Sequence, residues 1–398
     1  MKGPTPGRLK RYACRVLGLE RYLLRPGDGR RRPQIAARHL VWGMLMAVVM
    51  RASSFQGVER LVRSRARRAI RVGRSFGDDT LGYFTERMDP EPTRRALCEV
   101  ARKAKRNKAF DDCRFIGLAV DGSGGGGSEE QGCALCRPVK NAQKEVVGYN
   151  HHFSLISVVG TGLTLPLDVE PYGPGDSEYA ASQRMLERTV GHLGRRFADY
   201  VVGDGLYASA PFLHTAGAAE LRVLARLKDN LPELSRQARG RFESMPPTAT
   251  FRVGDDRVEA WDADDFDPWE GLEWKTVRVL RYLQHKKDGT VVEAYWLTDF
   301  PTRQVGSRAL YLMAKSRWEI ENGGFNDGKN RYGMAHIHHH HDRSLLVLWL
   351  LIALAMTLER LYRQRYLHRG THAIREAIEL VHWLWLAIGH PAAARDTS

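Results

Sequence analysis

Asp204 is the residue whose surroundings point most directly to chemistry. It follows residues 200–202, a short apolar run of strand formers, and it stands between Gly203 and Gly205, which end that run. In open α/β sheets, ligands and metal ions gather at the carboxyl ends of the strands, where Asp204 is predicted to lie. The alternative is a turn residue without a chemical role, because Asp is common in glycine-rich turns.

Two further acidic residues stand in comparable positions. The apolar run 115–120 ends at Asp121, so this residue is also predicted to follow a strand. Glu321 lies four residues after Arg317, which places both side chains on one helix face. Glu319 points about 200° away from Glu321, so only one of the two can face a shared site. The alternative for Glu321 is a surface ion pair with Arg317, which contributes little to stability.

Carboxylates arranged in this way predict a metal site. Hard cations such as Mg²⁺ prefer oxygen ligands, and Mn²⁺ is expected to substitute for it. Two divalent cations about 3.5–4 Å apart can activate the attacking oxygen of a phosphodiester reaction and stabilise the leaving oxygen. Asp121, Asp204 and Glu321 could together hold such a pair of cations in a ribonuclease-H-like site, with two ligands at strand ends and one on a helix. Without further support, the surface ion pair is the stronger interpretation of Glu321, and the resemblance described below selects these three as the predicted catalytic residues and metal ligands.

The net charge of +15 is concentrated in one part of the chain. Residues 1–110 hold 27 Lys and Arg against 9 Asp and Glu, a net of +18, whereas residues 111–398 carry a net of −3. This asymmetry predicts a segment that binds a polyanion, and nucleic acid is the first candidate. A solvated basic surface is the alternative.

Residues 60–74 contain seven arginines between small and branched apolar residues. We predict an amphipathic basic helix that lies along phosphates, with Arg60, Arg63, Arg67 and Arg71 as the contacts to DNA. A membrane surface is the weaker alternative, because the large aromatic anchors of interfacial helices are missing.

Apolar runs and cysteine usage predict a protein of the reducing cytoplasm. The runs 40–50 and 345–356 are shorter than the roughly 18 residues that a membrane span needs, so buried core helices are expected. No signal-peptide pattern opens the sequence. Five cysteines are too sparse, and odd in number, for a disulfide framework.

The order of periodic segments predicts an α/β fold with a mixed sheet and four parts. Residues 1–110 have helical patterning and are predicted to form a basic DNA-binding domain. Residues 111–231 and 301–362 alternate strand and helix patterns and form the predicted catalytic core. Residues 232–300 contain β-like runs separated by turns and are predicted to be an all-β insertion, and residues 363–398 form a C-terminal helical segment.

The segment after the first strand begins with four consecutive glycines, so residues 124–148 are predicted to form a flexible loop. Cys133 and Cys136 lie in this loop, ahead of the histidine pair 151–152. A zinc site needs four convergent ligands, and adjacent histidines of a strand point to opposite faces, so at most one of the pair can join. Two free loop thiols are the expectation, and the histidine run 338–341 is expected to be a solvated loop.

These stretches resemble the DDE transposases of bacterial insertion sequences, in the branch whose third motif is the YREK signature. A β-rich insertion between the second and third carboxylates is also typical of that branch, and the resemblance covers about residues 75–360. The matching motifs are Asp121-Gly122-Ser123, Asp204-Gly-Leu-Tyr207, Leu227-Lys-Asp-Asn230, and Arg317 with Glu321.

Two positions depart from that branch. Its Tyr lies three residues before the Arg, where this sequence has Ala314, and its Lys lies seven residues after the Glu, where this sequence has Gly328 followed by Lys329. At 100° per residue, seven positions return to within about 20° of Glu321, whereas eight land about 80° away. A local irregularity at the glycine pair 323–324 would correct the position of Lys329.

The resemblance implies a DNA transposase that cuts at the ends of an insertion sequence and joins them to target DNA by metal-dependent phosphoryl transfer. It also implies a ribonuclease-H-like core, Arg317 and Lys329 as contacts to DNA, and a homodimer on double-stranded DNA near the bacterial nucleoid. No membrane contact is expected. Two alternatives stay open: a nuclease of the same fold without strand transfer, and a DNA-binding protein with a degenerate catalytic core.

Overall fold

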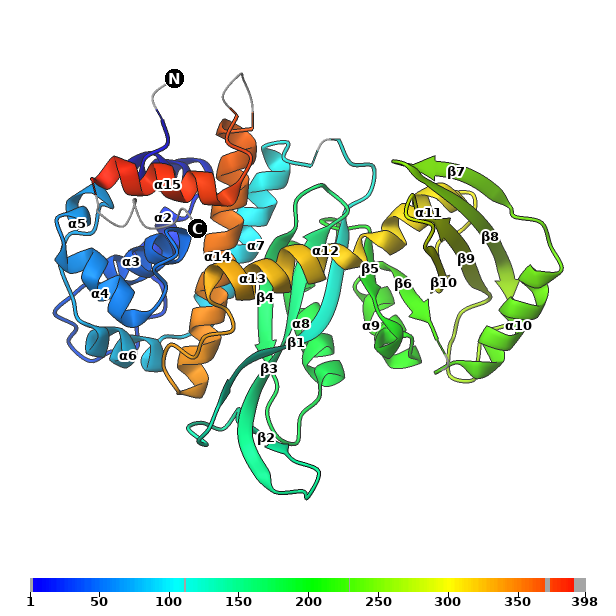
Figure 1. The fold of residues 1–398 in the computed structure, drawn as a ribbon, viewed down its shortest axis with the longest axis horizontal. Coiled ribbons are helices and arrows are strands. Elements are labelled where there is room, and N and C mark those ends of the chain that lie inside the picture. Colours follow the sequence, from blue (N-terminus) through cyan, green and yellow to red (C-terminus); the bar gives the residue numbers. More distant parts are fainter. Residues whose placement is uncertain (1–2, 111, 229, 369–372, 390–398) are drawn as a thin grey trace.

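A single mixed β-sheet runs through most of the protein, with helices at both ends of the chain gathered beside it (Figure 1). The computed structural model describes residues 3–110, 112–228, 230–368 and 373–389. Asp229 lies outside these ranges, as do residues 369–372 and 390–398 of the predicted C-terminal helical segment.

The elements of the described residues are as follows. The strands are β1 Gly117–Ser128, β2 Arg137–Lys140, β3 Val146–Val159, β4 Leu165–Pro171, β5 Tyr200–Gly203, β6 Arg222–Leu227, β7 Ala249–Val253, β8 Asp256–Phe266, β9 Val277–His285 and β10 Val291–Thr298. The α-helices are α1 Pro6–Arg11, α2 Glu20–Leu24, α3 Ala37–Val49, α4 Phe55–Arg63, α5 Ala66–Ala69, α6 Asp78–Arg87, α7 Glu91–Arg106, α8 Glu178–Leu193, α9 Ala210–Ala218, α10 Pro232–Glu243, α11 Ser307–Lys315, α12 Arg317–Glu319, α13 Asp327–Tyr332, α14 Asp342–Tyr366 and α15 Ala377–Ile388. The π-helices are η1 Tyr12–Val16 and η3 Ile320–Asn326, and η2 Gly205–Tyr207 is a 3-10 helix.

The middle of the sheet has the strand order β4-β3-β1-β5-β6. β3 is antiparallel to β1 and β4, whereas β5 is parallel to β1 and β6 is parallel to β5. Parallel neighbours need a crossover, and α9 provides it between β5 and β6. α9 begins after Ser209 with Pro211 in its first turn, as the sequence predicts. The predicted α/β fold with a ribonuclease-H-like mixed sheet is confirmed.

The four consecutive glycines form part of a strand, so the prediction of a flexible loop over residues 124–148 is wrong. β1 continues through them and stays paired with β3 across a register shift. A Cβ at Gly125 would stand 2.6 Å from Trp349 of α14. One at Gly126, whose φ is +111°, would stand 2.4 Å from the carbonyl oxygen of Ala335. The glycines therefore permit a close approach between β1 and the C-terminal part of the chain.

Residues 232–300 differ from the predicted all-β insertion in two ways. They begin with the helix α10, and their last strand, β10, pairs with β6. β7 to β10 consequently extend the central sheet instead of forming a separate one. Trp261 of β8 is buried and donates from Nε1 to the carbonyl of Met245 at 2.8 Å, so it packs within this part of the sheet.

Helix α14 lies at the centre of the helical part of the protein. It is 25 residues long and apolar enough to cross a membrane by length and composition, yet 94% of its most apolar window is buried inside the protein. It packs on β4 and on α3, α6 and α7, so helices of the N-terminal segment share a core with a helix near the other end of the chain (Figure 1). The buried helices predicted at 40–50 and 345–356 are confirmed, and the second extends well beyond its apolar run.

Residues 60–74 do not form the single amphipathic helix that the sequence predicts. α4 ends just before Ser64, whose hydroxyl donates to the carbonyl of Leu61 and accepts from the backbone N–H of Ala66. Serine competes with helical hydrogen bonds in this way, and the following helix α5 has only four residues. The arginines are therefore spread over two short helices and the turns around them.

The four arginines predicted to contact DNA have different surroundings. Arg60, Arg63 and Arg71 are exposed, although Arg63 also pairs with a glutamate one turn earlier in α4. Arg67 is half-buried, and its Nη1 donates to the carbonyl of Gly73 at 2.8 Å. Three of these side chains are thus accessible to a phosphate, whereas Arg67 supports the local fold.

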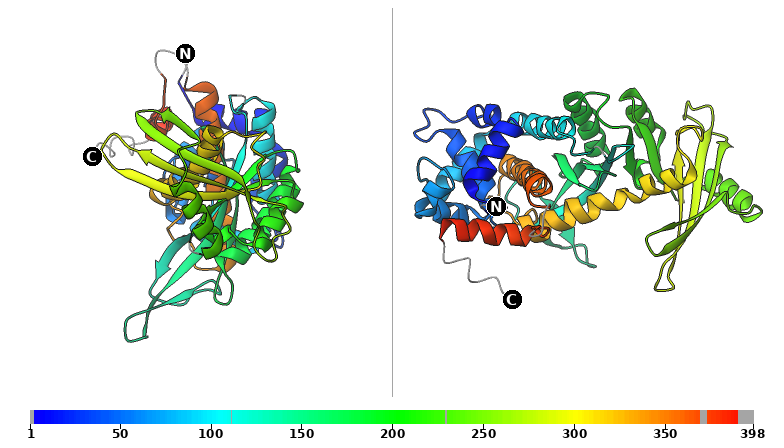
Figure 2. Two further views of the ribbon diagram at one scale, coloured as in Figure 1. Left: turned by 90° about the vertical axis from the view of Figure 1, so that its right-hand side faces the viewer. Right: turned by 90° about the horizontal axis from the view of Figure 1, so that it is seen from above.

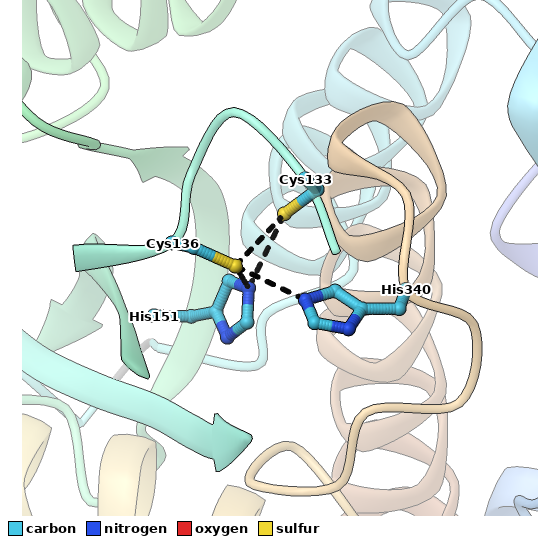
Figure 3. Close-up of side chains that lie close together, drawn as sticks. All are labelled: Cys133, Cys136, His151 and His340. Atoms are coloured by element: carbon cyan, nitrogen blue, oxygen red, sulfur yellow. Dashed lines mark hydrogen bonds between the residues drawn. The ribbon is translucent and has the colours of Figure 1, made fainter. Parts of the chain in front are cut away.

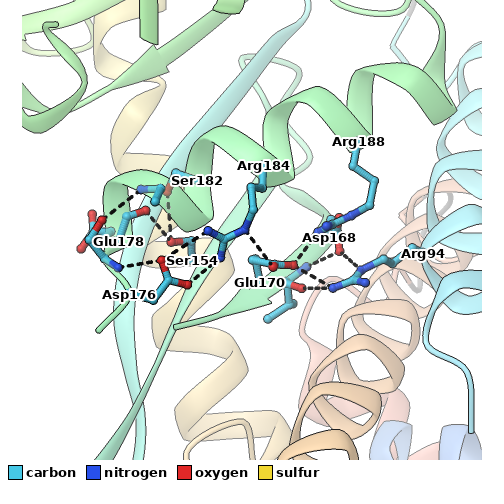
Figure 4. Close-up of polar contacts among 12 residues, drawn as sticks. Arg94, Ser154, Asp168, Glu170, Asp176, Glu178, Ser182, Arg184 and Arg188 are labelled. Atoms are coloured by element: carbon cyan, nitrogen blue, oxygen red, sulfur yellow. Dashed lines mark hydrogen bonds and ion pairs between the residues drawn. The ribbon is translucent and has the colours of Figure 1, made fainter. Parts of the chain in front are cut away.

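A network of arginines and carboxylates joins α7, β4 and α8 (Figure 4). Arg94 of α7 lies 3.0 Å from the Asp168 carboxylate and 2.9 Å from that of Glu170. Arg188 of α8 contacts the same two carboxylates at 2.7 and 2.8 Å. Asp168 is buried, and the guanidinium groups of Arg94 and Arg188 compensate its charge. Removing either arginine would leave the buried carboxylate with less compensating charge, which is costly. The network fixes α8 against the sheet, and with it the residue that begins this helix, Glu178.

Candidate active site

Asp121 and Asp204 are aligned by the pairing of β1 with β5. Ala119 pairs with Val202, an offset of 83 residues. The same offset aligns Asp121 with Asp204 two positions further along, on strands that lie about 4.8 Å apart in a sheet. Asp204 follows the end of β5 as predicted, whereas Asp121 lies inside β1, because the glycines after it continue the strand.

The turn that carries Asp204 is held from two directions. Asp204 caps η2, with its Oδ1 accepting from the backbone N–H of Leu206 at 2.8 Å. The ammonium of Lys228 lies 3.5 Å from its Oδ2. Asn230 donates to the carbonyl of the residue after Asp204 at 2.9 Å. The stretch after β6 therefore orients this turn, although Asp229 within it lies outside the described residues.

A fourth carboxylate, Glu178, lies beside β1 and was not predicted. A Cβ at Gly122 would stand 2.2 Å from its carboxyl group, so the Glu178 side chain lies directly over the strand next to Asp121. Tyr207 donates to Glu178 Oε1 at 3.0 Å, and Tyr172 donates to Oε2 at 3.4 Å. The position of Glu178 depends on how α8 packs on the sheet. No local sequence pattern indicates that packing.

Burial and mutual repulsion shift the pKa values of these carboxyl groups. Burial raises the pKa of Asp121 to about 6, and the charges of Glu178 and Asp204 add to this rise against the effect of Arg317. Burial also raises the pKa of Glu178, which the hydrogen bond from Tyr207 partly offsets. Carboxylates that repel one another in a partly buried place favour a bound cation, because it relieves both costs.

Arg317 links the third predicted carboxylate to the first. Its Nη1 donates to Asp121 Oδ2 at 3.0 Å, and its Nη2 lies 3.5 Å from Glu321 Oε2. Glu319 instead accepts hydrogen bonds from the backbone N–H of Gly160, at the turn between β3 and β4. The structure therefore brings Glu321 to the same side of the core as Asp121 and directs Glu319 elsewhere.

The helical run from α11 to α13 passes along the sheet between the β7–β10 end and the helical part (Figure 2, right). Its middle is the π-helix η3. A π-helical turn holds more residues than an α-helical turn, so an extra residue is absorbed without rotating the helix that follows. Lys329 comes eight residues after Glu321, but the π-helix turns it to the side of the helix that a residue seven positions after Glu321 would occupy in a regular α-helix. Its Nζ donates to Ser123 Oγ at 2.5 Å. Gly328 faces Met334, since a Cβ there would stand 3.0 Å from its sulfur.

Two glycines allow η3 to lie close to the sheet. A Cβ at Gly323 would stand 2.6 Å from Thr164 Oγ1, and one at Gly324 would stand 2.8 Å from Leu155. The irregularity that the sequence predicts at this glycine pair is present. π-Helical segments occur frequently at functional sites.

The tyrosine of the YREK signature has no counterpart in the helix. Ala314 is buried at its position, and Tyr311 packs on Tyr282 of the extended sheet. The phenols beside the carboxylates are Tyr207 and Tyr172, which come from other elements. Sequence analysis placed Tyr207 in a motif but gave it no partner.

The donors gathered here suit hard divalent cations. Asp121, Asp204, Glu321 and Glu178 offer carboxylate oxygens, which Mg²⁺ and Mn²⁺ prefer over nitrogen or sulfur. Arg317 already places a positive charge between two of them. The cluster can therefore offer oxygen ligands to cations beside the middle of β1 and the end of β5.

The sequence profile of the transposase DDE domain family matches residues 118–358, which run from β1 to α14 and contain all four carboxylates. The chain belongs to the transposase DDE domain family. Transposases of this family generally use a divalent metal ion, in keeping with the donor set described above. The match supports a transposase function, in a class of enzymes that cleave and transfer DNA.

One solved structure to which this chain is similar is the piggyBac transposase synaptic complex with hairpin DNA, determined by cryo-EM. The sequence identity is 11% and the TM-score is 0.46, over 97% of this chain and 80% of the piggyBac chain. No curated protein sequence matches the chain.

Proposed function

We propose that this protein is the transposase of a bacterial insertion sequence, of the YREK-signature branch, and that it cuts the element ends and joins them to target DNA. The observation that carries the proposal is that Arg317 contacts both Asp121 of β1 and Glu321 of η3, while the pairing of β1 with β5 aligns Asp204 with Asp121. The family membership supports the reaction class. The orientation of Lys329 supports membership of the YREK branch, because the π-helix directs this lysine toward β1 although it comes one residue later than the lysine of that branch.

Asp121, Asp204 and Glu321 are the proposed ligands of two Mg²⁺ ions, for which Mn²⁺ can substitute. When bound, these ions would activate the attacking oxygen and stabilise the leaving oxygen of the phosphodiester. Glu178 adds negative charge beside Asp121, and Tyr207 holds its carboxylate in one orientation. The cluster thus keeps its donors fixed before DNA arrives, which avoids reorganisation during the reaction.

Arg317 and Lys329 are the proposed contacts to the phosphate of the reacting strand. Arg317 neutralises Asp121 and Glu321 in the described state, and its Nε is buried without a partner among the described residues. Cations that take over both carboxylates would release its guanidinium for a phosphate, which it can bind through two parallel hydrogen bonds. Burial lowers the pKa of Lys329, and its ammonium contacts Ser123 of β1, two residues after Asp121.

Double-stranded DNA is the proposed partner, and the N-terminal helices are proposed to bind the element ends. Their net charge of +18 supports this assignment, as does the exposure of Arg60, Arg63 and Arg71. We also propose that the protein acts as a homodimer on DNA and works in the bacterial cytoplasm at the nucleoid. A homodimer would present two catalytic clusters to two element ends.

The experiment combines the full chain with a supercoiled plasmid that carries the inverted repeats flanking the gene, a second target plasmid and Mg²⁺. We expect strand breaks at the repeat ends and element DNA joined to the target. Cleavage without joined products would replace the proposal with a nuclease. Binding to the repeats without cleavage would replace it with a degenerate DNA-binding protein.

Lys329→Ala is expected to slow strand cleavage by about 10²-fold, because it removes one fixed positive charge that would lie beside the reacting phosphate. Thermal unfolding should change little, since the lysine is only half-buried. The matched control is Arg331→Ala on the same helix, whose side chain is exposed and pairs with Asp327. Equal cleavage rates for the two variants would contradict the role of Lys329.

A further inference from the structure

Four side chains with nitrogen and sulfur ligand atoms converge away from the carboxylates (Figure 3). Cys133 and Cys136 come from the connection between β1 and β2, His151 comes from β3, and His340 comes from the connection between α13 and α14. One ligand atom from each residue lies within 4.8 Å of all the others. Three segments that are distant in sequence therefore meet at one point.

The separations of the ligand atoms match the edges of a tetrahedron. The two sulfurs are 3.8 Å apart, and His151 Nε2 lies 3.3 Å from Cys133 Sγ and 3.4 Å from Cys136 Sγ. His340 Nε2 lies 3.1 Å from Cys136 Sγ. Around a zinc ion with bonds of about 2.3 Å to sulfur and 2.0–2.1 Å to nitrogen, these edges would be about 3.8 Å and about 3.5 Å. The sulfurs are too far apart for a disulfide, whose bond is about 2.05 Å.

The surroundings are shaped for this arrangement. Cys136 and His151 are almost fully buried, with 1% and 0% of their surface exposed. His151 Nδ1 donates to the carbonyl of Gly126 at 3.3 Å, which leaves Nε2 as the ligand atom and fixes the ring. A Cβ at Gly132 would stand 2.2 Å from His340 Nδ1, so only glycine leaves room for this ring.

We propose that Cys133, Cys136, His151 and His340 bind one structural zinc ion. Two thiolates and two imidazoles in tetrahedral placement favour zinc over the hard cations of the carboxylate cluster. Four protein ligands close the coordination shell, so the ion has a structural and not a catalytic role. Sequence analysis expected free thiols because the adjacent histidine pair supplies one ligand only, and the missing ligand comes from the histidine run much later in the chain.

The zinc ion would tie the connection between α13 and α14 to β3 and to the connection between β1 and β2. Ser123 of β1 and Lys329 of α13, which are hydrogen-bonded to each other, belong to elements that lead into two of the tethered connections. A tether between segments far apart in sequence also removes conformational freedom from the unfolded chain. The site thereby stabilises the fold without taking part in the carboxylate cluster.

The test is the metal content of the full chain, purified without a metal-affinity step and gel-filtered in buffer free of added metal. We expect about one zinc ion per chain by mass spectrometry of the elements. The Cys133→Ser, Cys136→Ser double variant should lose it, and His340→Asn should retain less than the wild-type protein. Cys113→Ser and His341→Asn are the matched controls, since both residues lie outside the cluster, and they should keep the full zinc content.

A second measurement serves if the double variant does not fold. Wild-type protein produced in cobalt-supplemented medium should show the sulfur-to-metal charge-transfer absorption and the strong visible bands of tetrahedral cobalt. Asp121→Asn should keep its zinc, so this test is independent of the transposase proposal. Wild-type protein without zinc, zinc retained in the double variant, or a cobalt spectrum without sulfur bands would each overturn the site.

Discussion

Asp121→Asn and Asp204→Asn are each expected to slow DNA strand cleavage by about 10³-fold or more, a loss of ~4 kcal/mol in transition-state stabilisation. Each substitution keeps the size of the side chain and removes one anionic ligand. Glu321→Gln should have a comparable effect. Binding to duplex DNA should change little, because the excess of positive charge lies in residues 1–110. Nicking of a supercoiled plasmid measures the first quantity, and a filter or gel assay measures the second.

Glu187→Gln is the matched control, because Glu187 is an exposed acid on α8, the helix that begins with Glu178. It should cleave at the wild-type rate. Glu319→Gln distinguishes the two glutamates of the third motif, and it should retain cleavage, since Glu319 binds the turn at Gly160. Loss of cleavage in Glu319→Gln together with full activity in Glu321→Gln would reverse the assignment.

The affinity of the full chain for duplex DNA is expected to fall by about 10³–10⁵-fold between 50 and 200 mM salt, if six to ten phosphates are neutralised. The reason is the release of counterions from DNA by the basic N-terminal helices. The slope of log affinity against log salt, measured by fluorescence anisotropy, gives the number of neutralised phosphates. An affinity that is flat over this range would contradict the proposed DNA grip.

Changing Arg60, Arg63 and Arg71 together to Gln should reduce that slope by about 2.7, at about 0.9 per phosphate on duplex DNA. Arg67 is left in place because it holds the carbonyl of Gly73. The matched control changes three exposed basic residues at the far end of the sheet and should leave the slope unaltered. These control residues are Arg257, Lys286 and Lys287.

The strands that carry the carboxylates could be predicted from the sequence because their signals are local. The apolar runs before Asp121 and Asp204 predict strands from their own residues, independently of distant parts of the chain. The order of strand and helix patterns favours a mixed sheet. The four-residue spacing of Arg317 and Glu321 likewise places both on one helix face, and the structure joins them in one ion pair.

The features that sequence analysis missed depend on partners far along the chain. The composition of the glycine run after Asp121 predicts a loop, but these residues pair with β3 as part of β1. Trp349 packs against them in space that a side chain would occupy. Residues 60–74 read as one helix by periodicity, but Ser64 competes for the backbone hydrogen bonds. Glu178 reaches the cluster through the docking of α8 on the sheet, which the ion pairs of Arg188 with Asp168 and Glu170 support.

The packing of α14 against α3, α6 and α7 has a consequence for the order of folding during synthesis. α3 is made early, whereas the synthesis of its partner α14 is complete only after some 366 residues have been joined. Until then the N-terminal helices cannot complete their core, and their apolar side chains stay open to solvent or to chaperones. Polypeptides that stop before α14 should therefore aggregate or be degraded.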